Sequence, residues 1–290
     1  MHPYQYIPAT NITEAVSLLA RYGPRARIMA GGTDLLVQLR GERFELDVVV
    51  DSKAIPELME LTLDGGLSIG AAVPCYQVYE DKAVAAAFPG IIDAASLIGG
   101  IQVQSRASLG GNLCNATPSA DGICPLIVHS GVVTLTGVDG TRTMAVEDFA
   151  TGPGRNALGN GEMLIKIYLP KPAANFGAAY QRFIPRNEMD IAIAGVASAV
   201  TLDASGKKVE SARIALAAVG PTPILAKKAS DSLVGQPATE ENFAKAGEIA
   251  ATEASPITDM RGTVEQRRHL VGVLTGRTLA QAVQRARGNA

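Results

Sequence analysis

The sequence predicts an α+β protein of two domains. Short apolar segments joined by Asp-Gly turns occur twice in its first half, which is typical of β-hairpins. A proline-rich segment at 170–175 interrupts regular structure, because proline lacks a backbone N–H and fixes φ. After it, strands are followed by helices without the strict alternation of an α/β fold. The chain has 290 residues, of which 47% are hydrophobic, so it can bury a sizeable core.

The first elements are expected in the order helix, strand, helix, hairpin. Apolar residues recur at helical spacing over 10–22, with Thr10 or Asn11 placed to cap the helix. A strand at 27–30 then leads through Gly31-Gly32 into a helix from about Thr33 to Arg40. The turn Asp64-Gly65-Gly66 joins two strands between residues 61 and 69.

Further along the first domain, a second hairpin is expected over 132–146, with its turn at Asp139-Gly140. The segment 94–98 has the character of a helix end, which Gly99-Gly100 stops. The proline-rich break sets the predicted domain boundary, which divides the chain into domains 1–175 and 176–290.

The second domain is expected to hold a strand pair and two helices. Strands at 191–202 and 209–219 flank a turn at 203–206, and helices follow at 239–253 and 263–286. This order favours a smaller α+β domain.

Composition excludes several classes of function. The 26 basic and 28 acidic side chains leave a net charge of −2, so nucleic acid is not expected as a partner. The chain opens without a basic region followed by an apolar core, and no apolar run is long enough to span a bilayer, so we expect a cytoplasmic protein with no transmembrane segment. The cysteines and histidines are scattered, so no metal site is predicted, and buried thiols are the simplest interpretation of the cysteines.

Two glycine pairs carry the chemistry, Gly31-Gly32 and Gly110-Gly111. Glycine lets the backbone approach a ligand closely, and consecutive amides in such a turn form a concave anion site. A helix opening at Thr33 adds the positive end of its dipole. Two such loops could hold the two halves of a pyrophosphate, although each pair taken singly is also the ordinary composition of a chain reversal.

A competing motif is rejected. Residues 152–157 match the spacing G-x-G-x-x-A, but no apolar strand precedes them and Pro153 removes one amide. We therefore expect a loop there. A phosphate-binding G-x-x-x-x-G-K-[ST] motif is also absent from the sequence.

Longer stretches around the glycine pairs resemble a known family. Residues 30–36 (AGGTDLL) and 108–121 (SLGGNLCNATPSAD) are similar to the FAD-binding medium subunit of the xanthine dehydrogenase and carbon monoxide dehydrogenase family. Residues 180–183 (YQRF) and 189–192 (MDIA) resemble that family's entry into its C-terminal domain. The resemblance therefore covers essentially the whole chain.

The resemblance implies a fold for each domain. The first would be a two-lobed FAD-binding domain of the vanillyl-alcohol-oxidase (PCMH) type, with the lobes dividing near residues 53–57. The second would be the smaller α+β C-terminal domain found in these flavoproteins.

The resemblance also implies a set of FAD contacts. Residues 28–35 and 108–112 would wrap the pyrophosphate and the ribityl chain of FAD. Asp121 would accept hydrogen bonds from ligand hydroxyls, and Ile98 and Leu164 would pack against the flavin. Arg182 stands where the family commonly has lysine, so its contact with flavin or phosphate is left open. The full set of predicted cofactor contacts is Ile28, Met29, Ala30, Gly31, Gly32, Thr33, Asp34, Leu35, Ile98, Ser108, Gly110, Gly111, Asn112, Asp121, Leu164 and Arg182.

Two further positions depart from the family pattern. Gln104 stands where a basic residue is frequent, and Ala107 stands where glycine is frequent. The glycine pair that follows is intact, so we interpret these departures as tuning of the site.

The function implied is electron transfer. A flavin connects one-electron carriers with two-electron acceptors, so this chain would take electrons from a [2Fe-2S] subunit and pass them to an external acceptor. A large subunit with a molybdenum cofactor of the molybdopterin cytosine dinucleotide type would hydroxylate the substrate. One large, one medium and one small subunit would form a heterotrimer, and two heterotrimers would form a dimer. The cysteines needed for an iron–sulfur cluster are missing, and no residue is assigned as acid, base or nucleophile.

Two other functions are considered. A self-contained flavin oxidase or dehydrogenase would need a substrate pocket of its own. A flavin-free assembly module would use the same fold only as a scaffold. The substrate of the holoenzyme and the final acceptor, whether NAD, a quinone, a cytochrome or oxygen, are left open by the sequence.

Overall fold

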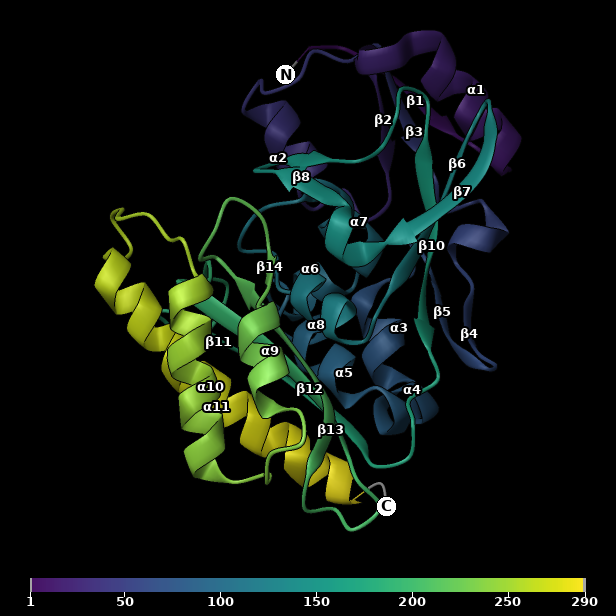
Figure 1. The fold of residues 1–290 in the computed structure, drawn as a ribbon. Helices are drawn as coiled ribbons and strands as arrows, with labels where there is room; N and C mark the ends of the chain where they lie inside the picture. Colours follow the sequence, from purple (N-terminus) through teal and green to yellow (C-terminus); the bar gives the residue numbers. More distant parts are fainter. Residues whose placement is uncertain (1, 289–290) are drawn as a thin grey trace.

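Three larger β-sheets and one two-stranded ribbon organise the chain, and the computed structural model describes residues 2–288 of it (Figure 1). The first sheet is parallel with strand order β1-β3-β2. The second is antiparallel with order β4-β5-β10-β6-β7, and the third is antiparallel with order β11-β12-β13-β14. Helices accompany each sheet, and this mixed content agrees with the predicted α+β class.

The first sheet and its helices form the lobe at the amino terminus. Helix α1 begins after Asn11, whose side chain accepts a hydrogen bond from the amide of Glu14, so the expected helix and one of its two candidate caps are confirmed. Strands β1 and β3 were not expected. Each has only four residues, β1 is largely exposed, and β3 is an uninterrupted buried run with no alternation. The elements are β1 (Gln5–Pro8), α1 (Ile12–Tyr22), η1 (Gly23–Arg25), β2 (Ala26–Met29), α2 (Leu35–Arg40) and β3 (Val48–Asp51).

The second sheet contains both predicted hairpins. They pair β4 with β5 and β6 with β7, and the long strand β10 joins the two hairpins in the centre of the sheet (Figure 1). The rejected glycine motif lies in a separate ribbon of two short strands, β8 and β9, and no helix follows it. The strands are β4 (Leu61–Leu63), β5 (Gly66–Gly70), β6 (Val132–Gly137), β7 (Gly140–Ala145), β8 (Ala150–Gly152), β9 (Arg155–Asn156) and β10 (Met163–Pro170).

Short helices fill the interval between β5 and β6, where the sequence predicted only the end of one helix at 94–98. That helix is α5, which ends at Ala95, and Gly99 follows with a φ of +63°. Each of these helices is too short to show a clear apolar period. The helices of this interval are α3 (Cys75–Glu80), α4 (Lys82–Ala87), α5 (Pro89–Ala95), α6 (Ile101–Gln104), α7 (Leu109–Asn115) and α8 (Ile123–Val128). Two 3-10 turns lie outside it, η2 (Pro56–Leu58) before β4 and η3 (Val146–Asp148) after β7.

The last third of the chain forms the third sheet and three helices. The predicted strand pair and both predicted helices are confirmed, with helix α10 capped by the side chain of Thr239. The elements are β11 (Phe176–Phe183), β12 (Ala194–Leu202), β13 (Val209–Ala217), β14 (Ile224–Leu225), α9 (Lys227–Leu233), α10 (Glu240–Glu253) and α11 (Val264–Gly288).

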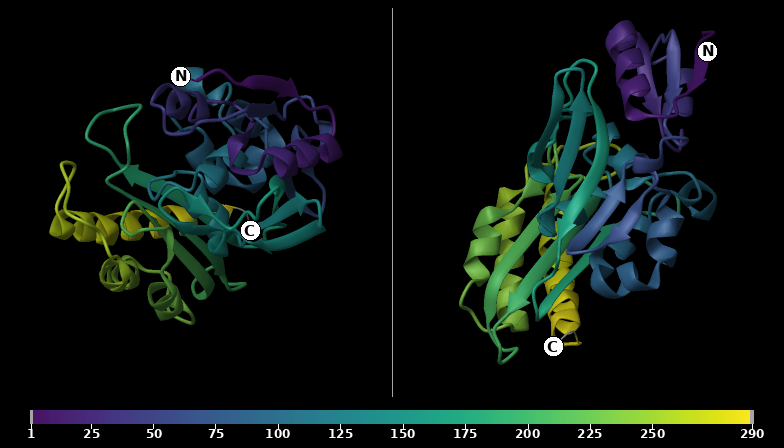
Figure 2. Two further views of the ribbon diagram at one scale, coloured as in Figure 1. Left: turned by 90° about the horizontal axis from the view of Figure 1, so that it is seen from above. Right: turned by 90° about the vertical axis from the view of Figure 1, so that its right-hand side faces the viewer.

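The third sheet is covered on both faces. Helices α9 and α11 pack on one face, with α10 against them, while α5 and α8 from the first half of the chain pack on the other (Figures 1 and 2). Alternate residues of β12 divide accordingly, since Val196 and Val200 belong to the core under the C-terminal helices and Ala197 and Ala199 to the core of the first half. The packed interior therefore continues across the proline-rich break.

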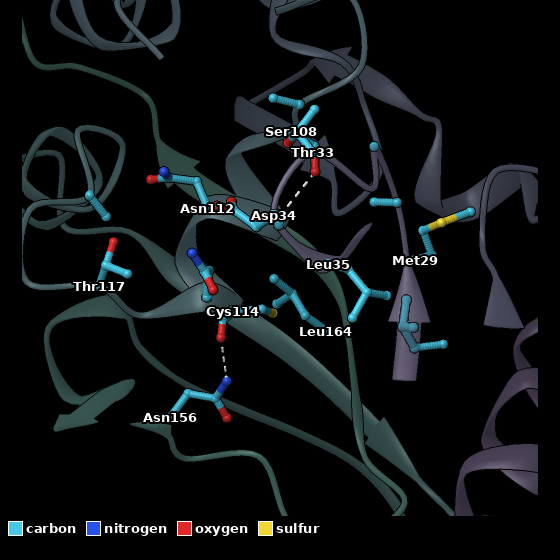
Figure 3. A pocket seen from close by; sticks show the side chains of 18 of the residues that line it. Met29, Thr33, Asp34, Leu35, Ser108, Asn112, Cys114, Thr117, Asn156 and Leu164 are labelled. Atoms are coloured by element: carbon cyan, nitrogen blue, oxygen red, sulfur yellow. Dashed lines mark hydrogen bonds between the residues drawn. The ribbon is translucent and has the colours of Figure 1, made fainter. Parts of the chain in front are cut away.

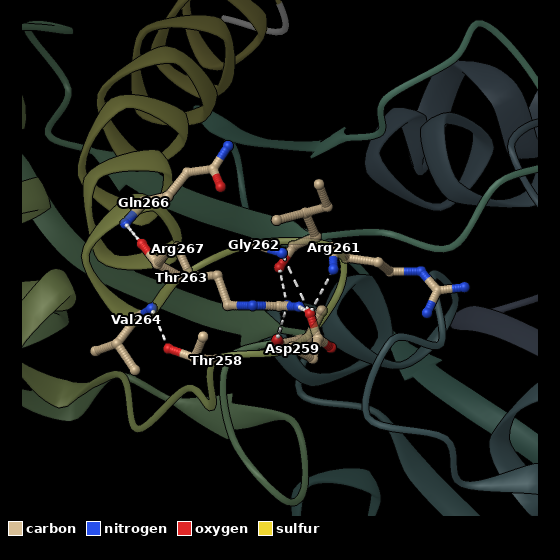
Figure 4. Close-up of polar contacts among 10 residues, drawn as sticks. Thr258, Asp259, Arg261, Gly262, Thr263, Val264, Gln266 and Arg267 are labelled. Carbon is tan, nitrogen blue, oxygen red and sulfur yellow. Dashed lines mark hydrogen bonds and ion pairs between the residues drawn. The ribbon is translucent and has the colours of Figure 1, made fainter.

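The segment before α11 is fixed by a polar cluster (Figure 4). The carboxylate of Asp259 accepts hydrogen bonds from the amide of Arg261 at 2.8 Å and from Nη2 of Arg267 at 2.7 Å. The buried Arg267 also donates to the carbonyl oxygen of Ile193 at 2.6 Å. This guanidinium therefore ties the segment before α11 to Ile193, the residue directly before β12.

No helix in the stretch 2–288 is long and apolar enough to cross a membrane.

A candidate FAD site between the first lobe and the second sheet

A cavity of about 950 Å³ opens between the first lobe, the helices α6 and α7 and the strands β8 to β10 (Figure 3). Its size lies within the range of about 300–1,000 Å³ that is typical of ligand sites. Every residue predicted as a cofactor contact lines this cavity, although the predicted set comes from six separate stretches of the chain.

The first glycine pair forms the loop between β2 and α2. Gly32 has a φ of +74°, a conformation that favours glycine. A Cβ at Gly31 would lie 2.0 Å from the carbonyl oxygen of Arg106, so only glycine lets this loop reach the segment before α7. The amides of Gly31 and Gly32 donate to no acceptor within residues 2–288. They are therefore available to a ligand in the cavity.

Helix α2 begins at Leu35, so the predicted start at Thr33 was wrong by two residues. Asp34 occupies the position before the helix, but its side chain makes no capping bond. Thr33 and Asp34 therefore extend the ligand-facing loop, and burial raises the pKa of the Asp34 carboxyl.

The second glycine pair lies in a helix, so the prediction of a turn there was wrong. Ser108 has extended backbone, and its Oγ accepts a hydrogen bond from the amide of Gly111 at 3.0 Å, which makes it the N-cap of α7 (Figure 3). A Cβ at Gly110 would lie 2.4 Å from the carbonyl oxygen of Ala71, so this glycine allows the helix to touch the strand end beside it. Gly111 instead faces the cavity and is exposed.

Asn112 connects α7 to the next part of the site. Its Oδ1 accepts a hydrogen bond from the amide of Gly122 at 3.0 Å. The bond holds the loop that carries Asp121 beside the first turn of α7. Both segments line the cavity.

Asp121 lies at the wall towards the third sheet, where two side chains of β11 meet it. Its carboxylate accepts hydrogen bonds from the hydroxyl of Tyr180 at 2.8 Å and from Nη1 of Arg182 at 2.5 Å. Burial raises the pKa of Asp121 to about 6, against the opposing effects of Arg182 and Tyr180. The side chain of Arg182 is only 5% exposed, and its Nε has no hydrogen-bond partner in the described part of the chain. Arg182 therefore has one buried donor left for a ligand.

The apolar wall comes from Ile98 and Leu164. Leu164 lies in β10 next to an irregularity in the pairing of β10 with β6, which breaks the regular alternation of faces. Both side chains are buried, at 8% and 4% exposure.

Several lining residues were missed by the sequence analysis. Gly154, Arg155 and Asn156 belong to the segment that was rejected as a nucleotide motif, and Thr151 directly precedes it; all four line the same cavity. Asn156 donates to the carbonyl oxygen of Cys114 at 2.7 Å, which ties this ribbon to α7 (Figure 3). The sequence signal that could have pointed to this ribbon is the glycine at position 154. The structure shows why glycine stands there, because its φ is +66°.

The cysteines are free thiols in the structure. Cys75 and Cys124 are buried, as expected, whereas Cys114 is only partly covered and lines the cavity. Burial raises the pKa of Cys75 and Cys114 to about 12, so both are protonated at neutral pH. Among residues 2–288, no cluster of three or more His, Cys, Asp or Glu side chains could hold a metal ion.

Comparisons with known proteins identify the family. The sequence of residues 2–172 matches the family model described as the FAD binding domain in molybdopterin dehydrogenase. Residues 178–282 match the family model of the CO dehydrogenase flavoprotein C-terminal domain. The chain belongs to this family of FAD-binding subunits.

Curated relatives of this flavoprotein align along nearly the whole chain. The xanthine dehydrogenase FAD-binding subunit of Escherichia coli O157:H7 is 32% identical, with 98% of this chain and 97% of the relative covered. The carbon monoxide dehydrogenase medium chain of Afipia carboxidovorans is 31% identical, with 98% of both chains covered.

Solved structures match the flavoprotein equally well. A chain of the Cu,Mo-CO dehydrogenase in its cyanide-inactivated form superposes with a TM-score of 0.93 at 30% identity, covering 98% of this chain and all of that one (100%). A chain of quinoline 2-oxidoreductase from Pseudomonas putida 86 superposes with a TM-score of 0.91 at 29% identity, with 98% of each chain covered. The family resemblance, the two-part fold, the oxidoreductase class and FAD as cofactor are thereby confirmed. The chain is a medium, FAD-carrying subunit of the molybdenum hydroxylase family.

Proposed function

We propose that this subunit accepts electrons from a [2Fe-2S] subunit and passes them to an external acceptor, within a complex whose large subunit carries the molybdenum cofactor and hydroxylates the substrate. The observation that supports it best is the cavity itself, in which the unpaired amides of Gly31 and Gly32, the first turn of α7 and the carboxylate of Asp121 offer binding groups for a dinucleotide. Relatives named as subunits of dehydrogenases, such as the medium chain of carbon monoxide dehydrogenase, support the division of labour. A dimer of heterotrimers is part of the proposal.

The residues of the chain would bind and orient the cofactor. The amides of Gly31 and Gly32 and the first turn of α7 would hold the diphosphate, because unpaired amides and a helix N-terminus favour an anion. Asp121 would accept hydrogen bonds from ligand hydroxyls with the lone pairs that Tyr180 and Arg182 leave free.

The remaining contacts concern the flavin end. Ile98 and Leu164 would pack against the ring system, and Arg182 would donate from its unpaired Nε. The bound flavin would supply the capacity to take up electrons one or two at a time. The protein supplies binding, orientation and electrostatics.

The domain boundary is also proposed rather than measured. Strand β10 ends at Pro170 and β11 begins at Phe176, so residues 1–175 and 176–290 are the proposed domains; Met1 and residues 289–290 lie outside the described residues. The two lobes of the first domain would divide at residues 53–57, between β3 and β4.

The test is electron transfer in the assembled complex. The chain is purified with its two partner subunits, and the absorbance of oxidised FAD is followed anaerobically after the large subunit's substrate is added. We expect bleaching with the complete complex and none when the iron–sulfur subunit is omitted. Steady oxidation of a small alcohol or aldehyde by this chain alone would instead support a self-contained oxidase.

A further inference from the structure

A lysine stands behind the first glycine loop, outside the cavity. Lys53 follows β3, and its Nζ donates to the carbonyl oxygen of Ala30 at 2.9 Å and to Oδ1 of Asp51 at 2.5 Å. Its side chain is 25% exposed, and it is not among the residues that line the cavity. Lys53 therefore contacts the loop without lining the cavity.

The bond to Ala30 determines the direction of the next amide. A trans peptide is planar, so the N–H of Gly31 points away from the carbonyl of Ala30. Because Lys53 holds that carbonyl, the Gly31 N–H is turned away from the lysine, and Gly31 itself lines the cavity. This amide has no acceptor in the described chain.

We propose that Lys53 is a positioning residue of the FAD site, which fixes the peptide between Ala30 and Gly31 so that the Gly31 amide is aimed at the diphosphate of the cofactor. The inference rests on the proposed placement of the diphosphate at this loop. Lys53 acts through the peptide and does not touch the cofactor.

The charge of Lys53 is already neutralised. Asp51 is 6% exposed and accepts hydrogen bonds from Lys53 and from the hydroxyl of Tyr6. Burial alone would raise the pKa of Asp51, but the bonds from Lys53 and Tyr6 outweigh it and the pKa is lowered. The lysine and the carboxylate therefore form a neutral pair, whose net field at the loop is small. Geometry is the larger contribution.

Four variants of the full-length chain separate these effects. Lys53→Met keeps the length of the side chain but removes the donor and the charge. Lys53→Arg keeps both the donor and the charge. Asp51→Asn combined with Lys53→Met removes the charges of the whole pair. Lys207→Met, at an exposed turn between β12 and β13, is the matched control for loss of one lysine.

The readout is the dissociation constant of FAD for the apoprotein, measured by flavin fluorescence, together with the melting temperature of each apoprotein. We expect Lys53→Met to bind FAD about tenfold or more weakly, which corresponds to the loss of one well-aligned hydrogen bond to a charged group. Lys53→Arg should recover part of the affinity, and Lys207→Met should bind as the wild type does. Lys53→Met should lower the melting temperature, because the buried carboxylate of Asp51 loses its ion pair, so all affinities are compared at a temperature below every melting transition.

The double variant decides between position and field. If Lys53→Met weakens binding only because it leaves the carboxylate of Asp51 unpaired, the double variant regains full affinity and the proposal is overturned. If the lysine acts on the peptide, the double variant binds as weakly as Lys53→Met. Wild-type affinity in Lys53→Met would also overturn it.

A measurement without substitutions covers the case in which Lys53→Met does not fold. Hydrogen exchange of the wild-type apoprotein is followed by mass spectrometry with and without FAD. The peptide that contains Gly31 should be protected by FAD, and an unchanged exchange rate in that peptide contradicts the inference. A wild-type chain that binds no FAD would instead contradict the placement of the cofactor itself.

Discussion

Substitution of the two adjacent glycines in α7 should have opposite consequences. In Gly110→Ala the new Cβ would lie 2.4 Å, 2.6 Å and 2.9 Å from the carbonyl oxygen, Cα and carbonyl carbon of Ala71. These are backbone atoms, so no side-chain rotation relieves the contact. In Gly111→Ala, apart from the chain neighbours and the backbone of the helix itself, the one described atom within 4 Å is Oγ of Ser108 at 3.1 Å.

The magnitudes follow from these distances. Overpacking costs about 1–3 kcal/mol, and backbone contacts at 2.4–2.6 Å belong at the upper end, while alanine in place of glycine returns up to about 1 kcal/mol of helix propensity. Gly110→Ala should therefore lower the free energy of unfolding by about 2 kcal/mol, or the melting temperature by about 4–8 °C. Gly111→Ala should leave the apoprotein as stable as the wild type or slightly more stable. Its methyl group enters the cavity, so FAD should bind about tenfold more weakly, which is ~1.4 kcal/mol.

The assay compares thermal and urea unfolding of the two apoproteins with their FAD affinities from fluorescence titration. Each variant is the control of the other, because both add one methyl group to the same turn of the same helix. The reasoning is refuted if Gly110→Ala is as stable as the wild type, or if Gly111→Ala loses stability but binds FAD normally.

Three further predictions concern buried polar groups. Arg182→Met should destabilise the apoprotein by about 3 kcal/mol, because it leaves the carboxylate of Asp121 buried without its ion pair, and adding Asp121→Asn should restore most of the loss in urea unfolding. Burial raises the pKa of Asp121 to about 6, so its contribution to the free energy of unfolding is present below about pH 4 and is lost as the pH rises through 6. The free energy of unfolding in urea should therefore fall between pH 4 and 7 in the wild type, and this fall should be absent in Asp121→Asn. His129 is buried between Phe88 and Phe176, its Nε2 has no partner, and burial lowers its pKa to about 3, so the wild type should lose stability as the pH falls below about 6.5. His129→Leu should reduce that acid loss in the same unfolding series.

Each of these has a contrary outcome. The ion-pair argument fails if Arg182→Met is as stable as the wild type at neutral pH. Parallel pH profiles of the wild type and Asp121→Asn would show that Asp121 titrates at its ordinary pKa. A His129→Leu profile that still falls below pH 6.5 as steeply as the wild type would assign the acid sensitivity to other groups.

Local signals in the sequence predicted the elements with clear turns and caps. The Asp-Gly turns gave both hairpins, and Asn11 and Thr239 cap the helices that the periodicity indicated. Strands β1 and β3 escaped because each has only four residues. β3 is buried throughout and shows no alternation, and β1 is largely exposed. The short helices between β5 and β6 escaped because a helix of six or seven residues shows less than two periods.

The candidate site was predicted through the family resemblance more than through geometry. The resemblance brought Asp121, Leu164 and Arg182 into one set, which no local pattern connects, and the structure places them around one cavity. The reason for glycine differs from what the turn interpretation implied. Gly31 and Gly110 are required by close contacts within the protein, whereas Gly111 faces the cavity, and such contacts cannot be read from spacing along the chain.

Lys53 illustrates the same limit. It lies 23 residues from Ala30 in the sequence, and only the parallel pairing of β2 with β3 brings its ammonium group to that carbonyl. No motif in the sequence marks it as part of the site.

The central claim is that the cavity between the first lobe and the second sheet holds FAD. The most direct measurement is the visible absorption spectrum of the purified full-length chain, with chemical identification and quantification of the released chromophore and of iron. The account predicts a stoichiometric amount of non-covalently bound FAD and no iron, with the FAD content lowered in Gly111→Ala. A colourless, folded protein that takes up no FAD on reconstitution would contradict it and leave a flavin-free scaffold as the better description.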